Sequence, residues 1–154
     1  MRTAASAALV SLVLVLAGCG AHVPTDPDRS LEQLTDGVLR AGASPAGGLV
    51  EVDDTHVTGT LADLMAEFAE SRGAQVRWTV ASEEDLVGLL ESDDLDVAIG
   101  GMTEETPWSD RVSVTRGYPD IPAANGRRVV VLLPLGENAL QAALEAFLDE
   151  RVRP

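Results

Sequence analysis

The spacing of hydrophobic residues alternates, from residue 31 onward, between the two-residue period of a strand and the longer period of a helix. Residues 75–80 (QVRWTV) alternate polar and apolar side chains, as a half-buried strand does. Residues 61–72 instead repeat their apolar side chains every three or four positions, which is typical of an amphipathic helix, and Gly73 marks its end. This reasoning predicts strands at 38–43, 75–80, 95–99 and 128–133, a short hairpin within 49–59, and helices at 61–72, after Ser82, from Thr106-Pro107 and at 138–151.

Local capping signals support two of these helices. Ser82 and Asp85 form a plausible capping pair, with the hydroxyl placed to accept an amide hydrogen bond in the first turn. Thr106 and Pro107 indicate another helix start, because proline at the first helical position loses no amide hydrogen bond. Since strands and helices alternate along the chain, we predict an α/β fold, a three-layer-like single lobe with a mainly parallel sheet flanked by helices.

We expect the N-terminal residues to form a targeting signal rather than part of this fold. Arg2 precedes an apolar run over 4–16 that is too short to span a bilayer as a mature helix. The run ends in Leu-Ala-Gly-Cys, which is similar to a bacterial lipobox; the alternative is an ordinary signal peptide with an incidental cysteine. Because Cys19 is the only cysteine and follows the apolar run directly, we expect it to be the lipid attachment site.

These features divide the chain into three parts. We expect a lipoprotein signal peptide over 1–18, a polar linker over 19–30 that begins at the lipidated Cys19, and one lobe over 31–154. Two or more acyl chains, such as palmitate, make a stable anchor, whereas one chain binds only marginally. The mature protein is therefore expected to be tethered to the cell membrane on its extracytoplasmic face, in the periplasm or at the cell surface.

The charge of the chain narrows the possible partners. The 25 acidic residues outnumber the 11 basic ones, all of them arginine, and leave a formal net charge of −14. Such a surface repels nucleic acid phosphates and anionic lipid headgroups, so we expect no nucleic acid partner. The acids could also concentrate cations, although keeping the domain soluble is a sufficient explanation for them.

Catalytic and metal-binding signatures are absent from the sequence. It contains no nucleophile elbow, no phosphate-cradling loop and no zinc signature, and its two histidines, His22 and His56, stand far apart. Residues 53–56 (DDTH) could suggest metal ligation, but a solvated turn explains them as well. The neighbouring acids Glu104 and Glu105 could sit beside a cation, or simply be solvated. We therefore expect a protein that is not an enzyme and that has no cofactor and no metal.

Four segments in order resemble one family. They are LEQLTDGVLRAGAS, VTGTLADLMAEFAESRGAQVRWTV, LLESDDLDVAIGGMT and TPWSDRVSVTRGY, and together they cover residues 31–118. In this order and spacing they resemble type 2 extracellular solute-binding proteins, the solute-binding protein family 3 that serves polar amino-acid importers of the ABC transporter class. The lipobox agrees with this resemblance, because such proteins are commonly lipid-anchored where no outer membrane retains them.

The resemblance implies a second lobe that this chain lacks. Members of the family insert that lobe after the segment that ends here at Tyr118, and the chain then returns to the first lobe. Here a loop, PDIPAANG, leads directly into RRVVVLLPLGENALQAALEAFLDERV, which looks like the return strand and closing helix. Judged by usual domain sizes, roughly ninety residues are missing. We therefore expect one half of a two-lobed clamshell.

The expected binding chemistry also departs from the family. The resemblance implies an arginine in the turn after the 95–99 strand, where a planar fork of donors grips the ligand carboxylate. Trp108 stands at that position, and Arg111 follows three residues later, on the same face of a helix begun at Pro107. Arg111 could substitute, or it could pair at the surface with Glu104 or Asp110.

We expect the binding edge at the carboxyl end of the strands, where open α/β sheets place their ligands. Gly101 allows ligand atoms to reach the backbone, although a tight turn explains the glycines of this segment equally well. The predicted ligand-binding residues are Ser44, Gly101, Met102, Thr103, Trp108 and Arg111.

Two functions fit these observations. The first is weak binding of a small polar solute or assistance to a membrane transporter, with a permease or a second-lobe partner completing the site. The alternative is a cell-surface protein-interaction module that keeps the fold without binding a solute, with Trp108 and Tyr118 as anchors.

Overall fold

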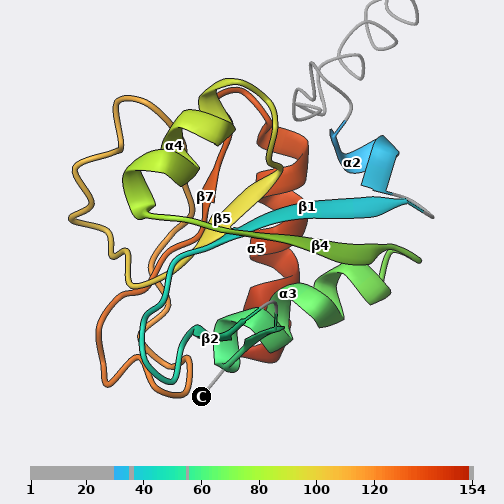
Figure 1. The fold of residues 1–154 in the computed structure, drawn as a ribbon. Coiled ribbons are helices and arrows are strands. Elements are labelled where there is room, and N and C mark those ends of the chain that lie inside the picture. The colour runs from blue at the N-terminus through green and yellow to red at the C-terminus, as the bar shows by residue number, and fades with distance from the viewer. Residues whose placement is uncertain (1–29, 35–36, 55, 153–154) are drawn as a thin grey trace, which may run out of the picture.

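The computed structural model describes residues 30–34, 37–54 and 56–152. The expected signal peptide, Cys19 and the linker lie outside the described residues, apart from Ser30. The elements in chain order are α2 (Ser30–Leu34), β1 (Val38–Ala43), β2 (Glu51–Asp53), β3 (His56–Thr58), α3 (Thr60–Glu70), β4 (Gln75–Val80), α4 (Glu83–Glu91), β5 (Val97–Ile99), β6 (Ser113–Val114), β7 (Leu132–Leu133) and α5 (Asn138–Arg151) (Figure 1).

A five-stranded sheet in the order β4-β1-β5-β7-β6 forms the centre of the lobe. Strand β1 pairs in parallel with β4 on one side and with β5 on the other, so that Ala43 lies opposite both Val80 and Ile99. Strand β7 runs antiparallel to β5 and to β6. The predicted α/β class is confirmed, and the sheet is mixed because the chain returns through β7 in the opposite direction.

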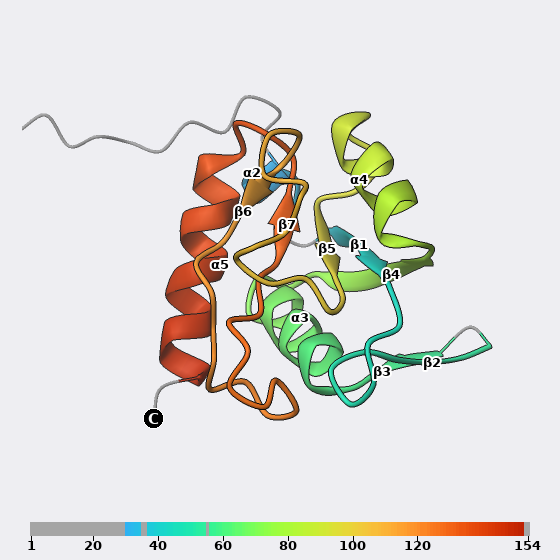
Figure 2. The ribbon, with the colours of Figure 1, turned by 90° about the vertical axis from the view of Figure 1, so that its left-hand side faces the viewer.

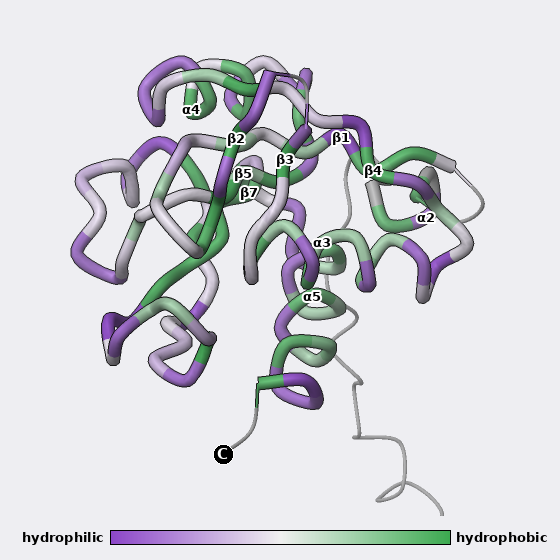
Figure 3. Tube along the Cα trace, turned by 60° about the horizontal axis from the view of Figure 1, so that its bottom comes forward, coloured by the Kyte–Doolittle hydropathy of each residue, from purple (hydrophilic) through white to green (hydrophobic). Residues whose placement is uncertain are grey.

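Helices cover both faces of the sheet, which gives the predicted three layers (Figure 2). Alternate residues of β5 divide the core: Val97 and Ile99 belong to the apolar cluster with α3 and α5, and Ala98 to the cluster under α4. Gly42 is needed for the second cluster, because a Cβ there would lie 2.6 Å from a methyl of Leu86. In Figure 3 the tube alternates between green and purple along α3 and α5, as expected for helices that bury one side.

Several predicted elements are confirmed and two are not. Strands β1 and β4 and helix α5 have the predicted bounds, and the Ser82 hydroxyl accepts the Asp85 amide hydrogen bond at 3.2 Å. Only the last two residues of the predicted 128–133 strand form a ladder, as β7.

The helix predicted from Thr106 and Pro107 is wrong, because the segment forms turns instead. Trp108 packs against the cluster under α4, and Val112, which follows shortly after, is buried in the same cluster. A helix would need a series of hydrogen bonds between residues four apart, and in this segment only the Val112 amide makes one, to the Trp108 carbonyl at 3.1 Å. The chain then becomes extended to form β6. Packing on the sheet therefore overrides the local start signal.

A docked loop, residues 119–126, stands where the resemblance implies an inserted second lobe. Ile121 and Ala124 are buried in the main core, and the Thr60 hydroxyl at the start of α3 donates to the Pro122 carbonyl at 2.7 Å. The backbone reverses through left-handed residues, with φ of 68° at Ala123 and 76° at Gly126. The loop is the orange segment at the bottom of Figure 2. It closes the lobe upon itself through its own packing.

A buried carboxylate joins β1 to the residue before β5. Asp96 is 6% exposed and accepts hydrogen bonds from the Arg40 amide at 2.7 Å and from its Nε at 3.1 Å. The Asp96 amide in turn donates to the Arg40 carbonyl at 2.8 Å. Because burying a carboxylate is costly unless it is paired, this interaction fixes the register of β5 against β1.

We expect Asp96→Ala to lower the free energy of unfolding by about 2–4 kcal/mol, because it leaves the donors of Arg40 without their acceptor. The matched control is Glu67→Ala, which breaks the exposed pair with Arg151 and should cost less than about 1 kcal/mol. Urea unfolding of both variants measures the difference. Equal losses for the two would show that the buried pair contributes no more than a surface one.

Candidate functional site

The parallel strands β4, β1 and β5 end at one edge of the sheet, here called the carboxyl edge. The chain leaving β1 and the chain leaving β5 touch there, with the Ser44 amide donating to the Ile99 carbonyl at 3.0 Å. A Cβ on Gly100 would lie 2.9 Å from the Met102 sulfur and 3.2 Å from the Ser44 Cβ, so a larger residue there would require its neighbours to shift. A Cβ on Gly101 would meet only the Ala46 Cβ, at 3.6 Å, which is an ordinary contact. The edge therefore exposes backbone between small side chains.

The structure brings three of the predicted site residues to this edge. Ser44 and Gly101 follow the ends of β1 and β5, and Thr103 forms an antiparallel bridge with Val129 just beyond them. Met102, between them in sequence, is 4% exposed and packs in the cluster under α4. Its side chain therefore belongs to the core.

Trp108 and Arg111 lie away from the carboxyl edge. Helix α4 starts at that edge and runs back, so Glu91 at its end lies at the opposite edge of the sheet. The Arg111 Nε donates to the Glu91 carboxylate at 2.9 Å, and its guanidinium lies 5.5 Å from the centre of the Trp108 ring. The predicted pairing of Arg111 with Glu104 or Asp110 is therefore wrong; the partner is Glu91, which only the fold brings near.

The side chains proposed as exposed aromatic anchors are packed inward. Trp108 lies against the cluster under α4, and its buried Nε1 has no partner among the described residues. Tyr118 is 7% exposed; its hydroxyl donates to the Glu145 carbonyl at 3.3 Å and accepts from the Arg116 Nε at 3.2 Å. Tyr118 therefore has no exposed ring, and Trp108 is half-buried with the Arg111 guanidinium over its ring.

A cavity of about 440 Å³ opens at the carboxyl edge, beside Thr103. Its size falls in the range of small-molecule sites. Sequence reasoning selected Thr103 and considered Glu104 and Glu105 as acids beside a cation, but it missed Gly126, Arg127 and Arg128, because these are distant along the chain. The lining residues are Thr103, Glu104, Glu105, Gly126, Arg127 and Arg128.

A carboxylate with three donors forms one wall of this cavity. Glu104 accepts from the Arg128 Nη2 at 2.9 Å, from the Arg128 Nε, and from the Gly117 amide at 2.9 Å. The Arg128 hydrogen bond, followed by that of the Gly117 amide, lowers the pKa of Glu104 below its ordinary value. A Cβ on Gly117 would lie 2.7 Å from the Glu104 carboxyl carbon, so the glycine permits this contact. The Glu104–Arg128 pair is thus internally neutralised.

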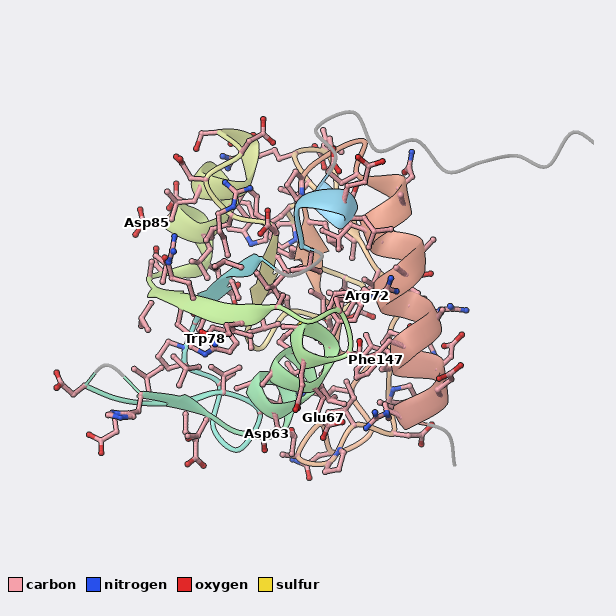
Figure 4. The ribbon with its side chains drawn as sticks, turned by 90° about the vertical axis from the view of Figure 1, so that its right-hand side faces the viewer. Asp63, Glu67, Arg72, Trp78, Asp85 and Phe147 are labelled. Atoms are coloured by element: carbon pink, nitrogen blue, oxygen red, sulfur yellow. The ribbon has the colours of Figure 1, made fainter. Side chains whose placement is uncertain are left out.

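A second cavity, of about 410 Å³, lies between α3, the docked loop and the end of α5. Asp63 and Glu67 project from the exposed side of α3 in Figure 4, and Glu67 pairs with Arg151. The cavity is outside the carboxyl edge and has no buried polar group directed into it among the described residues. The described residues also contain no group of three potential metal ligands.

The comparisons show the fold of this chain. No family model matches it, and no curated protein matches it either. The arginine-bound form of domain 1 from TmArgBP is 23% identical, with a TM-score of 0.67, over 77% of this chain and 97% of that one. A point mutant of the same domain, also arginine-bound, gives 23% identity and a TM-score of 0.67 over 78% and 95%. A variant of ArgBP from T. maritima gives 26% identity and a TM-score of 0.50, over 56% of this chain and 39% of that one.

These similarities confirm the resemblance at the level of the fold. The chain matches nearly the whole of an isolated domain 1, whereas it spans less than half the length of the longer ArgBP chain. It therefore has the fold of a single lobe of a solute-binding protein, as the sequence predicts. Within residues 30–34, 37–54 and 56–152, none of the helices has the length and apolar character needed to cross a bilayer.

Titration of Tyr118 tests the packing at the point where this residue forms a bridge with Val129. Burial raises the pKa of this phenol to about 12, although Arg116 partly lowers it. Because the folded pKa is above the ordinary value of 10.0, the phenol favours the folded state below pH 10, and this contribution is lost as pH rises towards 12. Ultraviolet titration reads it directly, since Tyr118 is the only tyrosine. Arg116→Gln should raise the pKa further, and a wild-type value near 10.0 would contradict the packing.

Proposed function

We propose that this protein is a lipid-anchored, extracytoplasmic solute-binding lobe that holds a small polar solute at its carboxyl edge. The observation that carries the proposal is the close approach of the chains leaving β1 and β5, where the Ser44 amide donates to the Ile99 carbonyl and a Cβ on Gly101 would meet only the Ala46 Cβ, at 3.6 Å. Backbone N–H and C=O groups at such an edge bind polar ligand atoms, and open α/β sheets bind their ligands there.

The similarity to an isolated domain supports binding by one lobe. Domain 1 from TmArgBP has this fold and is in an arginine-bound form. We infer that the present lobe likewise holds a solute without a second lobe in the same chain. Because a single lobe cannot close around the ligand, water stays in contact with it and the affinity is weak. Arg111 does not supply the carboxylate contact, because its guanidinium is held by Glu91 at the opposite edge.

The N-terminal segment supports a membrane-tethered role. The apolar run over 4–16 and Cys19 have the pattern of a lipidated signal sequence, and the polar composition of residues 19–30 suits a tether for the lobe at 31–154. A lobe tethered at the membrane surface has a high effective concentration next to membrane proteins. This arrangement suits delivery of solute to a transporter of the ABC class, whose permease would provide the missing face of the site.

The alternative role as a protein-interaction module loses its main support. It depends on Trp108 and Tyr118 as exposed anchors, whereas Trp108 packs against the cluster under α4 and Tyr118 is buried in the main core. Among the described residues the most exposed large hydrophobic side chain is instead Leu135, at 61%. A single exposed leucine is normal for a protein surface.

A thermal-shift screen with amino acids, polyamines and divalent cations tests the proposal. A solute at ten times its Kd should stabilise the folded protein by about 1.4 kcal/mol, which raises Tm by a few degrees. We expect Gly101→Leu to abolish this shift, because its side chain would fill the carboxyl edge next to Ala46.

The matched control is Gly88→Leu in α4, where an added Cβ has no atom within 4 Å. It should keep the ligand-induced shift. If no compound in the screen stabilises the wild-type protein, solute binding is refuted and the interaction module becomes the better account.

A further inference from the structure

We propose that Arg127, the residue directly before the return segment 128–133, is the residue that recognises a carboxylate on the bound solute, with the Thr103 hydroxyl beside it and Glu105 at the rim. The inference rests on the proposed function and names the chemistry of its ligand. The family resemblance places carboxylate recognition in the turn after β5. Arg127 instead comes 24 positions after Thr103 in the chain, on the opposite side of the cavity of about 440 Å³.

Arg127 differs from the adjacent Arg128 in whether its guanidinium has an ion-pair partner. Arg128 is neutralised by Glu104, whereas Arg127 has no carboxylate within ion-pair distance among the described residues. Its Nε donates to the Ala124 carbonyl at 3.3 Å, which leaves both terminal amino groups of the guanidinium without a bond to described residues. A planar pair of free donors matches the two oxygens of a carboxylate.

The docked loop holds this arginine in place. The Arg127 amide donates to the Ala124 carbonyl at 3.1 Å, and Ala124 is fully buried in the main core. Gly126 has φ of 76°, and a Cβ there would meet no atom within 4 Å, so open space lies next to the arginine. Arg127 is exposed, and its Nε hydrogen bond to the Ala124 carbonyl holds the base of the guanidinium before the ligand arrives.

The other side of the cavity supplies complementary groups. Thr103 lines it from the loop after β5, and its hydroxyl makes no hydrogen bond to the described residues. The Glu105 carboxylate is exposed and makes no ion pair to them. Since Arg127 and Glu105 bring opposite charges to one cavity while Glu104 and Arg128 cancel each other, the site has no net charge. It should therefore accept a carboxylate that is accompanied by a positive group, and reject a second negative charge.

Titration of the full chain with four small probes, followed by amide chemical shifts, tests this assignment. The probes are β-alanine (carboxylate and ammonium), propionate (carboxylate alone), succinate (two carboxylates) and propylamine (ammonium alone). We expect affinity to fall in the order β-alanine, propionate, succinate, with shifts at Thr103 and Arg127. Propylamine should not bind at this cavity, since it has no carboxylate for Arg127 to recognise.

The variant Arg127→Gln should weaken β-alanine binding at least about tenfold, the effect of losing a charge-assisted contact. Arg77→Gln is the matched control, because Arg77 on β4 is exposed and also has no ion pair with described residues. It should leave the affinity unchanged.

Three outcomes would overturn the inference. If Arg127→Gln and Arg77→Gln bind β-alanine equally tightly, or if the wild-type protein binds succinate as tightly as β-alanine, Arg127 and Glu105 do not set specificity. If a compound of the thermal-shift screen binds at Gly101 while none of the carboxylate probes shifts Arg127, the proposed function stands and this assignment fails. If neither set binds, both fail.

Discussion

The fold depends on the return segment 128–133, which lies hydrogen-bonded between the chain leaving β5 and the chain that contains β6. On one side the Val130 amide donates to the Met102 carbonyl at 3.1 Å, and on the other the Thr115 amide donates to the Val131 carbonyl at 3.0 Å. The side chains from Val129 to Leu133 are all buried. Because buried backbone groups must be paired, losing this segment would leave the Met102 carbonyl and the Thr115 amide without partners and would strongly destabilise the lobe.

This constraint explains why the lobe is closed by a short docked loop. The chain leaves the sheet at Tyr118 and must re-enter at Arg128, directly beside it, since Tyr118 and Val129 form a bridge. A second lobe can be inserted between two such neighbouring points, and so can a tight turn of the kind seen here. The loop buries Ile121 and Ala124, so the lobe needs no other domain to cover that part of its core. The same re-entry places Arg127 and Arg128 opposite the loop after β5, and so creates the cavity.

Much of the fold could be predicted from local patterns. The β4 strand alternates polar and apolar residues, and α5 has a long helical repeat, so both have the predicted bounds. Ser44, Gly101 and Thr103 were placed correctly at the carboxyl edge because each follows the end of a predicted strand.

The failures all involve contacts between distant segments. The Thr106-Pro107 signal indicates a helix, yet the packing of Trp108 and Val112 on the sheet prevents it. The partner of Arg111 is Glu91, 20 positions away, and the partner of Arg128 is Glu104, 24 positions away. Local spacing cannot supply such pairs, because they depend on how α4 and the return segment cross the sheet.

Hydrogen exchange tests the central claim most directly, namely that the return segment and the docked loop complete one self-contained lobe. The account predicts that the amides of Val130, Val131 and Tyr118 exchange as slowly as those in the middle of β1, through global unfolding, with Ala124 in the loop also protected. Fast exchange at Val130 and Val131, while β1 remains protected, would contradict it. The return segment would then not be part of the folded core.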